Sequence, residues 1–107
     1  MSQTAASQTV LDTLIIGAGP TGLSCGIEAQ RAGLRFLIVE KGALVDSIRR
    51  FPTNMVFFST AENLELGGIP FPSTHPRPTR QEALQYYRRV CEYFRLPVRL
   101  YTPVTSV

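Results

Sequence analysis

Residues 10–40 read VLDTLIIGAGPTGLSCGIEAQRAGLRFLIVE, and this stretch decides the fold. The apolar run at 10–16 ends in glycines without polar alternation, which is typical of a parallel strand covered on both faces. Residues 21–32 contain good helix formers and stop at Gly33, which suits the left-handed position after a helix. The run at 35–39 has the character of a second buried strand. This stretch therefore predicts a strand–helix–strand unit in a parallel sheet.

The glycines of GAGPTG, residues 17–22, fit the GxGxxG pattern that binds the phosphates of a dinucleotide. Gly17 permits a tight turn, Gly19 a close approach of backbone to pyrophosphate, and Gly22 a close helix–strand contact. Backbone amides at the helix start would face the phosphates, and the helix dipole would remove the need for a lysine or arginine in the loop. The alternative is a glycine-rich turn that merely joins a strand to a helix.

Glu40 follows the second predicted strand. Its carboxylate can accept hydrogen bonds from ribose hydroxyls at this position, and it would repel a ribose phosphate. The alternative is a solvated acid after a strand. The motif chemistry therefore leaves FAD and NAD open and disfavours NADP at this site.

Residues 42–78 form a segment far longer than an ordinary connection. Five prolines punctuate it, but its aromatic and aliphatic content is too high for a disordered linker. We therefore expect a folded excursion that covers the cofactor.

A second helix is predicted after this excursion. Thr79 and Glu82 stand three residues apart, as in a capping box. Apolar residues then follow at helical spacing and predict one buried stripe: Leu84, Tyr87, Val90, Cys91 and Phe94. Pro97 is expected to end the helix, and residues 98–101 to resume a strand. Residues 102–107 begin another apolar segment, so we expect the domain to be incomplete at its carboxyl end.

The composition is that of a small globular protein. The chain has 107 residues, 44% of them hydrophobic, and a net charge of +3. Its arginine-rich second half could present a basic face to nucleic acid, but the modest total charge favours a solvated helix face. No apolar run could cross a bilayer, and residues 1–9 lack the features of a signal peptide. We expect a flexible tail at 1–9, one domain at 10–107, and neither a nucleic-acid nor a membrane partner.

Cys25 and Cys91 lie far apart and form no CxxC pair. This usage suggests a reducing cytoplasm, with both cysteines as small buried residues. His75 lies in the proline-rich loop, where an exposed histidine is expected. We therefore assign no catalytic residue and no metal ligand in this portion.

Three segments carry a resemblance to a known family: IIGAGPTGLSCGIEAQRAG at 15–33, IVEKG at 38–42 and FPTNMVFFSTAENLELGGIPF at 51–71. They resemble the bacillithiol disulfide reductase (YpdA) family, FAD-containing and NADPH-dependent flavoproteins similar to thioredoxin reductases. The similarity runs from Leu14 onward and includes RPTRQEALQYYRRV at 77–90. It implies an α/β fold: part of a Rossmann-like FAD-binding domain with a parallel sheet, from the amino-terminal part of a flavoprotein with two dinucleotide-binding domains.

The resemblance also implies which residues bind FAD. The residues at the positions that hold FAD in the family are Gly17, Gly19, Pro20, Thr21, Gly22, Glu40, Lys41 and Val104. Of these, Glu40 and Lys41 would lie at the adenosine ribose, and the backbone of Val104 would contact the adenine.

The loop at 51–60 is expected to approach the flavin. Its candidates for polar contact are Thr53, Asn54 and Ser59, and its candidates for packing are Phe57 and Phe58. The alternative is that these aromatic residues belong only to the core, since either role would bury them.

The sequence departs from the family at Thr21, where many members carry a cysteine. Threonine cannot form a mixed disulfide, so thiol–disulfide exchange through this position is excluded. Cys25 lies one helical turn further on, but without a basic neighbour it is expected to be an inert packing residue. Relatives also continue into an NADPH-binding domain, so the 107 residues alone are not expected to catalyse the reaction.

The function expected from these observations is that of an FAD-dependent, NAD(P)H-linked oxidoreductase. The electron acceptor would be a small-molecule disulfide or a similar compound, and the full-length protein could form a homo-oligomer. The alternatives are a flavin monooxygenase-like enzyme and a non-catalytic nucleotide-binding remnant.

Overall fold

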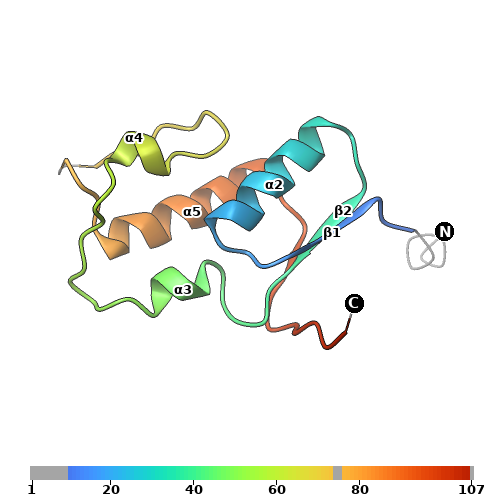
Figure 1. Cartoon of the computed structure of the whole chain (residues 1–107). Coiled ribbons are helices and arrows are strands. Elements are labelled where there is room, and N and C mark those ends of the chain that lie inside the picture. The colour runs from blue at the N-terminus through green and yellow to red at the C-terminus, as the bar shows by residue number, and fades with distance from the viewer. Residues whose placement is uncertain (1–9, 74–75, 107) are drawn as a thin grey trace.

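The computed structural model describes residues 10–73 and 76–106 (Figure 1). The tail predicted at 1–9 and the histidine predicted to be exposed at 75 lie outside the described residues.

The sheet has three parallel strands in the order β1-β2-β3. They are β1 (Thr13–Ile16), β2 (Phe36–Val39) and β3 (Val98–Arg99). In β1 and β2, Thr13 is paired with Phe36. The parallel sheet predicted from the sequence is therefore confirmed.

All three strands are shorter than predicted, the second by only one residue, since it begins at Phe36 instead of residue 35. The first begins at Thr13 rather than at residue 10, because its pairing with the second strand starts at Arg35, whose carbonyl accepts from the Asp12 and Thr13 amides. The third ends at Arg99 rather than at residue 101, because Tyr101 adopts a left-handed φ of 52° that interrupts an extended chain. Residues 102–106 form no strand.

Helix α2 (Pro20–Arg31) connects β1 to β2 and packs on both strands. It ends as predicted: Gly33 has a φ of +73°, and the Leu34 amide donates to the Ala29 carbonyl at 3.0 Å, as in a Schellman motif. The sequence 10–40 therefore forms the predicted strand–helix–strand unit.

The helices leave part of the sheet uncovered among the described residues. Along β1 the burial alternates, and Leu14 and Ile16 are 48% and 57% exposed. The prediction that this strand is covered on both faces is therefore wrong for the described chain, since α2 packs on one side only.

The excursion is folded in its described part, residues 42–73 and 76–78, as predicted. It contains α3 (Asp46–Arg49) and α4 (Ala61–Leu64), which flank α5 (Arg80–Phe94) in Figure 1. Tyrosine hydroxyls of α5 fasten it: Tyr86 donates to the Ile69 carbonyl at 2.6 Å, and Tyr87 to the Leu64 carbonyl at 2.9 Å. The excursion therefore covers α5.

Helix α5 begins with the predicted capping box of Thr79 and Glu82. Its buried face contains Tyr87 and Val90 as predicted, and also Ala83 and Tyr86; the other residues of the predicted stripe are partly buried. The helix ends at Phe94, because Arg95 adopts a left-handed φ of 53°, so Pro97 lies beyond the end instead of causing it.

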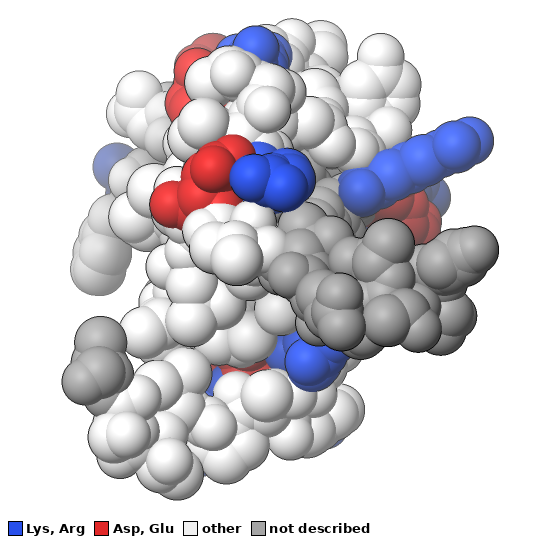
Figure 2. All heavy atoms as spheres, turned by 90° about the vertical axis from the view of Figure 1, so that its right-hand side faces the viewer, with Lys and Arg blue, Asp and Glu red and all other residues white. Residues whose placement is uncertain are grey.

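The surface charges are mixed in sign. Figure 2 shows basic and acidic side chains interspersed among uncharged residues on one face. Ion pairs such as Arg31 with Glu28, at 2.9 Å, are largely exposed. Among residues 10–73 and 76–106, no helix has the length and apolar character needed to span a membrane.

Replacing Tyr87 with phenylalanine is expected to lower the free energy of unfolding by roughly 1 kcal/mol, because the buried hydroxyl loses its bond to the Leu64 carbonyl. Burial raises the pKa of Tyr87 to about 12. Its neutral form therefore stabilises the fold below the unfolded pKa near 10, and this contribution is lost as pH rises through the folded value.

Urea unfolding of wild type and Tyr87→Phe at pH 7 and above pH 10 measures both effects. Tyr93→Phe is the control, since Tyr93 is 72% exposed on the same helix. Equal stabilities of the two variants at pH 7 would contradict the prediction.

Candidate functional site

The glycine turn between β1 and α2 leaves open space at Gly19 but none at Gly22. Gly17 has a φ of +110°, and its amide donates to the Val39 carbonyl at 2.7 Å. A Cβ at Gly22 would overlap the carbonyl oxygen of Gly17, whereas a Cβ at Gly19 would meet nothing within 4 Å. Gly22 therefore sets the helix–strand contact, and Gly19 borders an open cradle.

The start of α2 is suited to an anion. No side chain caps it, its first turn holds no acidic residue, and Pro20 occupies the first position. The first amides of a helix have no carbonyl partner within it, and the helix dipole favours negative charge there. The 12-residue helix therefore offers backbone donors beside Gly19.

Glu40 is only 9% exposed and binds the glycine turn directly. Its Oε1 accepts from the Ala18 amide at 2.8 Å, and its Oε2 from the Gly42 amide at 2.9 Å. A carboxylate has about four lone-pair positions, so each oxygen keeps the capacity to accept another hydrogen bond. Glu40 therefore fastens the turn and can still receive a ribose hydroxyl.

The segment after Glu40 also binds the backbone carbonyl of Ala18. The Ala18 carbonyl accepts from the Val45 amide at 2.9 Å. Val45 is fully buried and has a φ of 46°, a left-handed conformation that is unusual for a β-branched residue. Such strain persists only where the surrounding structure holds it, and it clusters at functional sites.

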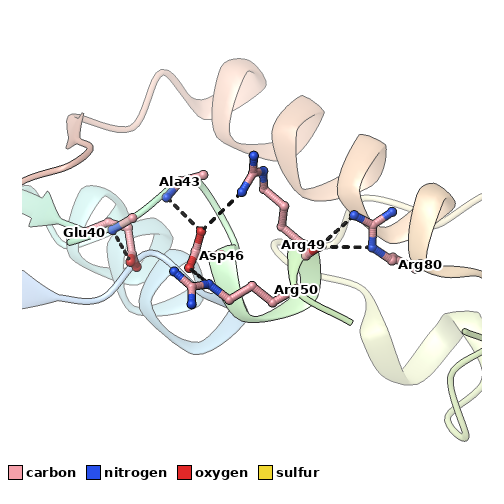
Figure 3. Close-up of polar contacts among 7 residues, drawn as sticks. Glu40, Ala43, Asp46, Arg49, Arg50 and Arg80 are labelled. Atoms are coloured by element: carbon pink, nitrogen blue, oxygen red, sulfur yellow. Dashed lines mark hydrogen bonds and ion pairs between the residues drawn. The ribbon is translucent and has the colours of Figure 1, made fainter. Parts of the chain in front are cut away.

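Asp46 organises the beginning of α3 (Figure 3). Its Oδ1 accepts from the Ala43 amide at 3.1 Å, and its Oδ2 from Arg50 Nε at 2.6 Å, while Arg49 Nη1 lies 3.9 Å from Oδ1. The Ala43 amide, followed by the side-chain bond and charge of Arg50, holds the pKa of Asp46 below its usual value, although burial opposes this. The guanidinium of Arg80 donates to the Arg49 carbonyl and so fixes α3 to α5.

Two cavities adjoin the glycine turn and share Glu40 and Lys41 in their walls. One, of about 280 Å³, is also lined by Gly17 and Val104. The other, of about 330 Å³, is lined by Gly19 and by three residues from α3 and its end: Asp46, Ser47 and Arg50. Five of the predicted FAD contacts therefore surround these two cavities.

A third cavity, of about 350 Å³, lies along the start of α2. Its lining includes the predicted contacts Pro20 and Thr21, together with Phe57 from the loop predicted to approach the flavin. Gly22 borders none of the three cavities, and its role is the close contact with Gly17.

Other residues of that loop are not brought to the glycine turn. Asn54 and Thr53 are exposed, and Asn54 lines none of the three cavities. Phe58 is 90% exposed, so the alternative that it belongs to the core is wrong for the described chain, while its packing on the flavin stays a prediction. The strand-like alternation of burial from Met55 to Thr60 explains this, since Phe57 and Phe58 point to opposite sides.

Cys25 is exposed, which contradicts the prediction that it is buried. The buried stripe of α2 contains Leu23 and Ile27, four residues apart, and Cys25 lies midway between them on the opposite side of the helix. Cys91 is half-buried, and burial raises the pKa of its thiol. Both thiols are free.

Sequence reasoning missed Asp46, Ser47 and Arg50. The available signal was an acid followed four residues later by an arginine, a spacing that pairs them on one helix face. No group of three His, Cys, Asp or Glu side chains in the described part of the chain could hold a metal ion.

Comparison with known proteins identifies what this arrangement resembles. Residues 14–107 match the family model described as pyridine nucleotide-disulphide oxidoreductase. Bacilliredoxin reductase Bdr of Bacillus subtilis is 46% identical over 77 residues, which are 72% of this chain and 24% of that protein.

Two solved structures are similar in fold. Bacillithiol disulfide reductase Bdr (YpdA) from Staphylococcus aureus superposes with a TM-score of 0.89 and 42% identity over 91% of this chain and 30% of that one. A mutant flavin monooxygenase from Stenotrophomonas maltophilia superposes with a TM-score of 0.78 and 32% identity, over 83% of this chain and 28% of that one. The chain spans less than a third of the length of these relatives.

Gly22→Ala is expected to lower the free energy of unfolding by about 2–3 kcal/mol, because the added methyl group overlaps rigid backbone at Gly17. Gly19→Ala is the matched control and is expected to stay within about 1 kcal/mol of wild type, since its methyl group enters open space. Urea unfolding followed by circular dichroism compares them. Similar losses in both variants would contradict this account of Gly22.

Asp46 is expected to make stability depend on pH in the acid range. Because its pKa is lowered in the folded state, its contribution is present above the unfolded value near 3.8 and is lost as pH falls through the lower folded value. Wild type should therefore lose more stability between pH 6 and pH 3 than Asp46→Asn does. Urea unfolding at both pH values tests this, and parallel losses would exclude the proposed stabilisation by the ionised carboxylate.

Proposed function

Since the chain belongs to the pyridine nucleotide-disulphide oxidoreductase family, we propose that it binds FAD as part of an NAD(P)H-linked flavoprotein. The observation that carries this proposal is the convergence of the glycine turn, Glu40, Lys41 and Val104 around two adjoining cavities. These segments are far apart in sequence and meet at the carboxyl ends of parallel strands, where α/β folds bind their ligands.

The residues present fit the adenosine diphosphate half of FAD. The open space at Gly19 and the uncapped start of α2 suit the pyrophosphate. Glu40 and Lys41 border both cavities and would hold the ribose between them, with Val104 at the adenine. When bound, FAD would take a hydride from a reduced nicotinamide and pass electrons to an acceptor.

On the flavin side, the contact proposed for Phe57 has more support than that for Asn54. Phe57 lines the cavity that also contains Pro20 and Thr21, and its ring meets Phe51 with centroids 6.0 Å apart. This arrangement suits the packing of one side of an aromatic ligand. Asn54 stays a candidate for a polar contact only if the ligand reaches the exposed part of the loop.

For the acceptor we propose a small-molecule disulfide or a similar compound, supported by the two Bdr proteins. Thr21 removes thiol chemistry from the turn itself, so the residues that reduce the acceptor would lie elsewhere. NADPH would bind in a further domain of a longer protein. We further propose a reducing cytoplasmic setting, supported by the two free thiols, and a homo-oligomer for the longer protein.

A flavin monooxygenase is the second candidate, favoured by the similarity to the Stenotrophomonas protein. Both candidates require FAD at this site. A longer protein that contains this chain would distinguish them, since a monooxygenase consumes oxygen together with an organic substrate, whereas a disulfide reductase produces two thiols per NADPH.

FAD binding is the direct test of the proposal. Titration of the chain with FAD should show saturable quenching of flavin fluorescence, and ADP should compete because it carries the same adenine, ribose and pyrophosphate. Gly19→Ala should weaken FAD binding by about tenfold or more, equivalent to about 1.4 kcal/mol, because its methyl group fills the cradle.

Gln85→Ala is the control for this titration, since Gln85 lies on the exposed face of α5. It should bind FAD with the affinity of wild type. Folded wild-type chain that fails to bind FAD, or equal affinities for wild type and Gly19→Ala, would contradict the proposed function.

A further inference from the structure

The cavity beside Gly19 has a second wall that the glycine motif does not supply. This wall consists of Asp46, Ser47 and Arg50, from α3 and the residue that follows it. It faces the start of α2, where the first amides have no carbonyl partners within the helix. An anion in this cavity would therefore lie between the backbone donors of one helix and the side chains of another.

The Arg50 guanidinium is held at this cavity by one of its five N–H groups. Its Nε donates to Asp46 Oδ2 at 2.6 Å, and Asp46 is itself fixed by the Ala43 amide. Figure 3 shows the Arg50 side chain turned back along α3 toward Asp46. Neither Nη group donates a hydrogen bond to any of the described residues, and the side chain is 73% exposed. Four N–H groups are thus presented in a planar fork that matches phosphate oxygens.

The charges around the cavity explain why such a cation is needed. Glu40 and Asp46 contribute two carboxylates to its walls, and Lys41 and Arg50 contribute two cations. The helix dipole amounts to about half an elementary charge, too little to offset two carboxylates beside a pyrophosphate. Because Lys41 is assigned to the ribose, Arg50 is the cation of this wall that can offset them at the pyrophosphate. The expectation that the helix dipole makes a basic residue unnecessary therefore neglects the acids that the fold brings to the site.

We propose that Arg50 binds the pyrophosphate of the dinucleotide through its Nη groups, with Asp46 as its positioning residue and the Ser47 hydroxyl as a further donor. This assignment rests on the proposed function in so far as the dinucleotide is FAD. It adds a side-chain clamp from α3 to the backbone site formed by the glycine turn.

The test compares Arg50→Gln with Arg49→Gln. Both variants lose one positive charge next to Asp46, since Arg49 Nη1 lies 3.9 Å from Asp46 Oδ1. Of the two arginines, only Arg50 lines the cavity. Affinities for FAD, ADP and adenosine are measured on the 107-residue chain at low and high ionic strength.

Arg50→Gln should weaken FAD and ADP about tenfold or more at low salt, the loss typical of a hydrogen bond to a charged group. It should leave adenosine within about twofold, because adenosine carries no phosphate, and it should show a smaller salt dependence than wild type. Arg49→Gln should bind all three ligands as wild type does. Arg50→Lys, which keeps the charge but loses the planar fork, should fall between wild type and Arg50→Gln.

Equal losses for Arg49→Gln and Arg50→Gln, or unchanged FAD binding by Arg50→Gln, would overturn the role of Arg50 and leave the proposed function standing. Binding of ADP that depends on Arg50 in a chain that does not bind FAD would overturn the proposed function alone. Failure of the folded wild-type chain to bind either FAD or ADP would overturn both. Should Arg50→Gln fail to fold, Arg50→Lys decides, and an FAD affinity equal to that of wild type would overturn the clamp.

Discussion

The candidate site depends on how Ala18 is held. Its amide donates to Glu40 and its carbonyl accepts from the Val45 amide, so both of its backbone groups are bound by the segment that follows β2. These two bonds fix the glycine turn to residues 40–46 and therefore fix the distance between α2 and α3. The walls of the cavity at Gly19, the position of Asp46 and the reach of Arg50 all follow from this constraint. The left-handed conformation of Val45 is a local cost of maintaining it.

The features predicted correctly from the sequence are those set by neighbouring residues. The strand–helix–strand unit, the helix end at Gly33 and the capping box of Thr79 and Glu82 each depend on a few consecutive positions, which the sequence displays directly. The glycine turn belongs to the same class, because the positive φ of Gly17 and the close contact of Gly22 with the Gly17 carbonyl favour glycine at these two positions.

The features that were wrong or missed depend on contacts between distant segments. The exposure of Cys25 is decided by which side of α2 meets the core, and a short apolar pattern does not specify that side. Arg50 lines the cavity with its Nε bound to Asp46, and the segment that carries Asp46 is bound to Ala18 through the Val45 amide. Such residues need the tertiary structure to be recognised.

The order of the strands has a consequence for the way the chain folds. Only the segment that contains α2 separates β1 from β2 in the sequence, so these strands can pair after a short loop closes. In contrast, residues 40–97 separate β2 from β3, so their pairing closes a much longer loop. The entropy cost of closing a loop grows with its length, and contacts of long sequence separation slow folding. The glycine turn therefore lies within the early unit, while the wall that carries Val104 is completed late. A nascent chain would therefore form the glycine turn before the cavity wall at Val104, so the two walls would be completed at different stages of folding.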